Sequence, residues 1–204
     1  MMMMMIQSEF SMTAALVRKI LEQPHGHNWS LQGFGQLRLY LDGVSRLHVW
    51  CPSLAVHGIE DSSVHDHPWD FESTLISGSI TDIMYDLAPV DHGWDQVEVY
   101  NEQLIKCGPG GFAKGDLRRV GLRRVMEVKY FNLGVTYRHR AEDIHRSMPS
   151  EGAVTLIKRT FRSDRCPDTA RVYWRGERWV SAEPRPATTA EITVACAAVL
   201  KGWQ

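Results

Sequence analysis

The feature that most constrains the fold is a series of short apolar segments separated by turn residues. The clearest pair, Leu37–Leu41 and Arg46–Trp50, flanks Asp42-Gly43, an arrangement typical of a tight β-hairpin. Further strands are predicted at residues 74–85, 96–105, 125–133, 153–159 and 171–180. No helical segments alternate with them, so the sequence predicts an all-β antiparallel sandwich or barrel rather than a parallel α/β sheet.

Helical periodicity is confined to the two ends of the chain. In Ser8–Glu22, apolar residues recur at helical spacing until Pro24 interrupts the pattern. Ala190–Lys201 is the second predicted helix, with Thr188 or Thr189 as its N-cap. We therefore expect three parts: an N-terminal helical extension (1–30), a barrel (31–183) and a C-terminal helix that packs on the barrel (184–204).

The overall charge excludes some classes of partner. A net charge of -1 over 204 residues gives no reason to expect nucleic acid or a membrane. The longest apolar runs fall well short of the roughly 20 residues that cross a bilayer.

Met1–Met5 lacks the basic residues and the cleavage site of a secretory signal. We expect a cytoplasmic protein with four reduced thiols: Cys51, Cys107, Cys166 and Cys196.

The segment around His65 and His67 carries the strongest chemical signal. Residues two apart on a strand point to the same face, so both imidazoles can bind one metal ion. Glu72 begins the next apolar run, from which its carboxylate can return to the same point. Such ligands suit Fe(II), Mn(II), Ni(II) or Zn(II). Asp66 and Asp70 alternate with the histidines, so we expect them to face away, as hydrogen-bonding supports or in solvent.

The string His65-Asp66-His67-Pro68-Trp69-Asp70-Phe71-Glu72 resembles the first motif of the cupin superfamily. A narrower resemblance, to small bacterial and phage cupins and to cysteine-dioxygenase-like proteins, includes Thr155–Arg159 and covers about residues 45–180. It implies a jelly-roll barrel, the double-stranded β-helix of cupins, with a divalent metal ion on His65, His67 and Glu72. His145 is the candidate for a fourth ligand, and His139 is its alternative. Some cupins bind metal through three histidines only, which would make Glu72 a base outside the ligand set.

The resemblance and the ligand types favour an Fe(II)-dependent oxygenase acting on a small polar substrate that carries a carboxylate or a thiol. Arg159, or an arginine of residues 138–146 such as Arg138, could hold a substrate carboxylate. Two alternatives stay open: a metal-dependent isomerase or epimerase of a sugar or sugar phosphate, and a non-enzymatic barrel with a vestigial site. Because cupins commonly pair through edge strands, a homodimer through Leu37–Leu41 is a further expectation.

Overall fold

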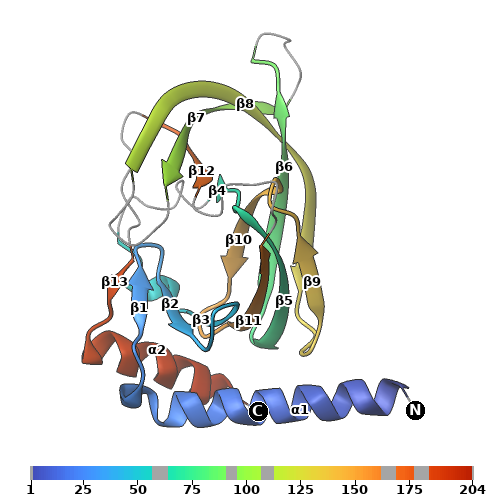
Figure 1. Ribbon diagram of the computed structural model, residues 1–204, viewed down its shortest axis with the longest axis vertical. Coiled ribbons are helices and arrows are strands. Elements are labelled where there is room, and N and C mark those ends of the chain that lie inside the picture. Colours follow the sequence, from blue (N-terminus) through green and yellow to red (C-terminus); the bar gives the residue numbers. More distant parts are fainter. Residues whose placement is uncertain are drawn as a thin grey trace.

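The computed structural model describes residues 2–56, 64–90, 96–106, 113–161, 169–176 and 184–203. These residues form two antiparallel β-sheets, with a helix near each end of the chain (Figure 1). The helices are α1 (Met2–Glu22) and α2 (Thr189–Gly202), and short 3-10 helices cover Pro24–Gly26 and Pro52–Leu54. The prediction of an all-β protein with two terminal helices is therefore confirmed. No helix in the described part of the chain is both long and apolar enough to cross a membrane.

The first sheet has seven strands in the order β13-β1-β2-β3-β11-β5-β9. Its strands are β1 (Ser30–Gln32), β2 (Gln36–Tyr40), β3 (Ser45–Trp50), β5 (Trp69–Ser77), β9 (Thr136–His139), β11 (Val154–Phe161) and β13 (Arg185–Pro186). The predicted hairpin is β2–β3. Its turn is closed by Asp42 Oδ1, which accepts hydrogen bonds from the amides of Val44 at 2.7 Å and Ser45 at 2.6 Å.

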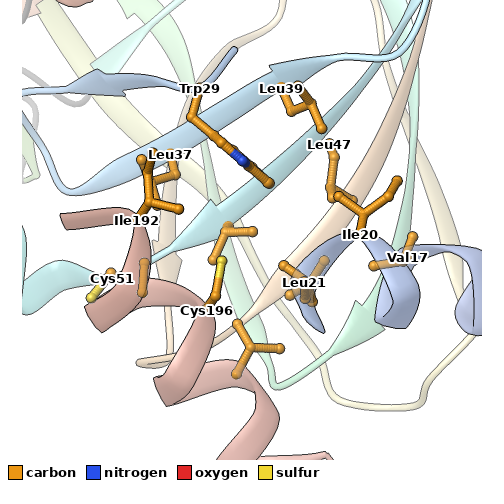
Figure 2. Packing of buried hydrophobic residues seen from close by; sticks show 14 of the residues in the cluster. Val17, Ile20, Leu21, Trp29, Leu37, Leu39, Leu47, Cys51, Ile192 and Cys196 are labelled. Atoms are coloured by element: carbon orange, nitrogen blue, oxygen red, sulfur yellow. The ribbon is translucent and has the colours of Figure 1, made fainter. Parts of the chain in front are cut away.

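One face of this sheet packs on both helices, which lie together at one end of the molecule (Figure 1). Figure 2 shows this core, in which side chains of α1 and α2 meet those of β2 and β3. Its labelled members are Val17, Ile20, Leu21, Trp29, Leu37, Leu39, Leu47, Cys51, Ile192 and Cys196. The opposite face of β3 carries Arg46 and His48, which are also buried. Strand β3 is therefore covered on both faces, and its polar side chains point toward the second sheet.

The second sheet closes into a barrel of six strands in the order β10-β4-β12-β7-β8-β6. Its strands are β4 (Val64–His65), β6 (Ile80–Ala88), β7 (Val97–Lys106), β8 (Ala113–Tyr130), β10 (Ile144–Pro149) and β12 (Thr169–Trp174). Each of them contributes to one apolar cluster, which includes Val64, Tyr85, Tyr100, Leu122, Ile144 and Tyr173. Since side chains alternate along a strand, His65 and His145 lie on the opposite face from Val64 and Ile144. That face looks toward the first sheet.

The structure corrects the predicted strand at 74–85. These residues belong to two strands, β5 and β6, which meet in a turn at Gly78. The φ angle of Gly78 is +74°, and a Cβ there would lie 2.7 Å from the Cα of Ala153. Only glycine fits this turn without strain. The sequence also predicts a turn at Gly78, and that prediction is confirmed.

Other expectations have mixed outcomes. The strands predicted at 96–105 and 153–159 correspond to β7 and β11, whereas 125–133 overlaps only the end of β8. The strand predicted at 171–180 corresponds to β12 up to Trp174, and residues 177–180 lie outside the described residues, as do Cys107 and Cys166. Cys51 and Cys196 are free buried thiols.

The premise that Leu37–Leu41 is an edge strand was wrong, because β2 pairs with β1 over Gln36–Arg38 and with β3 on its other side. The homodimer itself stays a prediction. The edges of the first sheet are β13 and β9.

Candidate metal centre

The centre begins with two histidines that face each other across neighbouring strands. Strand β4 lies between β10 and β12, and His65 is directly opposite His145 in the β4–β10 pair. Directly opposed residues of antiparallel strands share a face of the sheet, and the two ring centroids are 4.8 Å apart. The fold therefore brings together two histidines that are far apart in the sequence.

His67 lies just beyond β4 and completes the group. Its Nε2 lies 3.1 Å from Nε2 of His145. Its ring stacks on Trp69 at 4.4 Å and meets the edge of Phe71 at 5.0 Å. The potential ligand atoms of His65, His67 and His145 all lie within 4.8 Å of one another. His145 is buried, whereas His65 and His67 are partly exposed, so this group can be reached from outside.

A second group shares His145. Asp82 of β6 is opposite Ser147 of β10, and its Oδ1 lies 3.0 Å from Nδ1 of His145 and accepts from the Ser147 hydroxyl at 3.1 Å. His139 Nε2 lies 2.9 Å from Asp82 Oδ2, yet neither ring nitrogen of His139 is aligned for a hydrogen bond. Asp82, His139 and His145 are all buried and form the second candidate metal-binding group.

Asp82 fixes the tautomer of His145. An ionised carboxylate only accepts hydrogen bonds, so Nδ1 of His145 carries the proton that faces Asp82. The lone pair of His145 is then on Nε2, the atom that faces His67. A carboxylate behind a histidine is the usual support of a metal-binding imidazole, because it holds both the tautomer and the orientation of the ring.

The electrostatics of the centre favour neutral histidines and an ionised aspartate. Burial, with the charges of the neighbouring His65 and His145, holds the pKa of His67 well below its ordinary value. Burial also lowers the pKa of His145, although Asp82 opposes this effect. Burial alone would raise the pKa of Asp82, but His139 and His145 together outweigh it and lower that pKa. These are the protonation states that a divalent cation requires of its ligands.

The distance between His67 and His145 suits a hydrogen bond and also fits a shared metal ion. Two imidazole nitrogens that each lie about 2.1 Å from one ion are about 3.0–3.4 Å apart, depending on the angle between them. The 3.1 Å between His67 and His145 fits that range. The ring nitrogens of His139 also favour a metal ion. Neither has a hydrogen-bond partner among the described residues, and buried polar atoms normally have one.

The structure does not bring Glu72 to these histidines. On β5, Phe71 points to the rings of His139 and His145, so the next residue points away. Glu72 lies opposite Arg138 on β9, and the two side chains form an ion pair of 2.6 Å. Both line an open cleft of about 610 Å³ beside β9, which His139 also reaches.

Arg159 lies beside Trp69, and Asp66 binds Arg171 of β12. Arg159 is within 5.5 Å of the Trp69 ring, and its guanidinium donates to the Gly43 carbonyl at 2.8 Å. Asp66 is buried and accepts hydrogen bonds from Arg171, from its amide at 2.6 Å and from Nη1 at 2.9 Å. The prediction that Asp66 is a hydrogen-bonding support is therefore confirmed.

Sequence reasoning did not find Asp82. Its signal is weak, a lone carboxylate within the apolar run Ile80–Met84. His139 was considered only as an alternative to His145, and the structure places both in the centre.

No protein-family model matches the chain, and no curated protein is similar to it. The fold and the site therefore define a class only. It is an antiparallel β protein with one sheet closed into a barrel and with candidate histidine and aspartate metal-binding groups between the sheets.

Proposed function

We propose that this chain is a metal-dependent enzyme of the cupin type, an Fe(II)-dependent oxygenase that acts on a small polar substrate. The observation that supports it most is the convergence of His65, His67 and His145, with His67 and His145 at 3.1 Å. Three imidazoles leave open positions on an ion, and imidazole suits Fe(II) as well as Ni(II) and Zn(II). A bound Fe(II) would supply the redox chemistry with dioxygen that side chains lack.

The residues around the ligands have separate tasks. Asp82 holds the His145 ring so that Nε2 points toward His67. Trp69 and Phe71 pack on the His67 ring and exclude water from that side. The partly exposed His65 and His67 leave the other side accessible to a substrate. This combination of a fixed ligand, an apolar wall and an open side is what a catalytic metal site needs.

Metal content and oxygen uptake test the proposal. Protein purified without oxygen and loaded with Fe(II) should hold about one ion per chain, and His67→Ala should lose it. His27→Ala, which changes an exposed histidine outside the centre, should retain it. Oxygen uptake should follow the addition of a small thiol or carboxylic acid. A wild-type protein that binds no transition metal in stoichiometric amount would contradict the proposal.

The same measurement separates the alternatives. Bound zinc without oxygen uptake would favour an isomerase, in which the ion polarises a substrate carbonyl. A large fall in the thermal midpoint of His67→Ala, beyond the loss of metal, would favour a structural or vestigial site.

A further inference from the structure

Strand β3 carries two polar side chains, Arg46 and His48, on the face opposite the core that packs on the helices. Arg46 and His48 are only 6% and 5% exposed. Among the described residues, neither Arg46 Nε nor His48 Nε2 has a hydrogen-bond partner. Buried polar atoms without partners are rare, and each costs about 1–3 kcal/mol if it stays unpaired. Two of them side by side indicate that something else supplies their partner.

Both unpartnered atoms are donors. The arginine Nε always carries a hydrogen. His48 Nδ1 lies 3.0 Å from Nε2 of Gln36, and an amide nitrogen only donates. Nδ1 of His48 is therefore the acceptor, and the ring hydrogen is on Nε2. The missing partner of each atom is accordingly a hydrogen-bond acceptor.

The positive charge near Trp69 indicates that the missing acceptor is an anion. The Arg46 guanidinium lies 4.6 Å above the Trp69 ring, and that of Arg159 lies 5.5 Å from the same ring. Within the described part of the chain, neither arginine forms an ion pair with a carboxylate. Burial and the positive charge of Arg38 lower the pKa of Arg46, although a hydrogen bond with the Tyr40 side chain opposes this effect. A negative group would compensate the charge of Arg46.

This anion position adjoins the candidate metal centre. Trp69, which carries Arg46, also stacks on His67 with ring centroids 4.4 Å apart. The Trp69 ring therefore contacts both Arg46 and the histidine cluster.

We propose that Arg46 and His48, assisted by Arg159, bind an oxyanion group of the substrate, a carboxylate or a phosphate. The inference rests on the proposed function in one respect, because it assigns this anion to the molecule on which the metal centre acts. Arg46 supplies charge and a directed N–H, His48 supplies a neutral donor, and Trp69 is the apolar wall beside them. The substrate class is a small organic acid or a phosphate ester rather than a neutral molecule.

Calorimetric titration of the full chain tests this, with benzoate and inorganic phosphate as separate probes. The wild-type protein should bind at least one probe, and the tighter probe identifies the carboxylate or the phosphate class. Arg46→Met and His48→Phe should each weaken that binding about tenfold or more, and Arg46→Lys should restore part of it. Arg18→Met, on the exposed face of α1, is the matched control and should bind as the wild type does.

Binding of neither probe, or equal binding by wild type and both site variants, would overturn the inference. His48→Phe keeps the test decisive if Arg46→Met does not fold. Titrations are run on chelator-treated and on metal-loaded protein. Comparing the two shows whether the proposed enzyme or the proposed anion site is contradicted. Anion binding that depends on Arg46 without any metal uptake contradicts only the proposed enzyme. Metal uptake without anion binding contradicts only this inference.

Discussion

At the scale of single residues, Asp82 decides how well His145 can serve as a ligand. Its Oδ1 accepts a hydrogen bond from Nδ1 of His145 at 3.0 Å, so the lone pair of Nε2 faces His67 and can bind a metal. Asp82→Asn removes the negative charge beside His145. The amide that replaces it can donate to Nδ1 of His145, which puts the ring proton on Nε2 and prevents Nε2 from binding a metal. We expect metal affinity to fall about 10- to 100-fold, measured by competition with a chelator. Asp86→Asn, an exposed position on the same strand, should leave the affinity unchanged, and an equal affinity in Asp82→Asn would contradict the assigned role.

We expect the buried Arg46 side chain to lower the free energy of unfolding of the protein. Its guanidinium is buried without an ion pair among the described residues, and its contacts with Trp69 and Tyr40 offset only part of that cost. We expect Arg46→Met to raise the free energy of unfolding by about 1 kcal/mol, measured by urea denaturation. The control Arg18→Met should change it by less than about 0.5 kcal/mol. A clear loss of stability in Arg46→Met would mean that the arginine is structural.

At the scale of elements, the sequence predicts those features whose cause is local. The β2–β3 turn depends on Asp42 binding amides two and three residues ahead. Helix α2 begins as expected, because Thr188 and Glu191 form a capping box within four residues. Asp82 is different, since only the pairing of β6 with β10 brings it to His145. No local pattern contains that contact, and motif spacing alone placed Glu72 on the wrong side of β5 for the cluster.

The β5–β6 turn is an element whose geometry the centre requires. Strand β5 carries Phe71 and strand β6 carries Asp82, so the turn at Gly78 sets their relative position. Gly78→Ala meets the Ala153 backbone and a positive φ, and should lower the free energy of unfolding by more than about 1 kcal/mol. Gly43→Ala, in a turn with nothing within 4 Å, is the matched control. Equal thermal midpoints for the two variants would contradict the strain argument.

At the scale of the whole molecule, the first sheet is covered on both faces. Helices α1 and α2 bury its outer face, and the second sheet covers the face that carries Arg46 and His48. Both faces of β3 are buried, so the alternation of its residues does not separate buried from exposed positions. The sequence alone therefore does not identify Arg46 as a buried cation. Polar groups buried in this way make the stability of the fold depend on pH.

His48 makes that dependence measurable. Burial, followed by the charges of Arg46 and Arg38, holds the pKa of His48 well below its ordinary value in the folded protein. The unfolded chain therefore takes up a proton first as pH falls below about 6.5, which favours unfolding. In metal-free protein, the free energy of unfolding should fall by about 1.4 kcal/mol more in wild type than in His48→Gln between about pH 7.5 and pH 5.5. Urea denaturation between about pH 7.5 and pH 5.5 measures this, and the exposed His27→Gln should behave as wild type. Identical slopes for all three proteins would show that His48 is not held neutral.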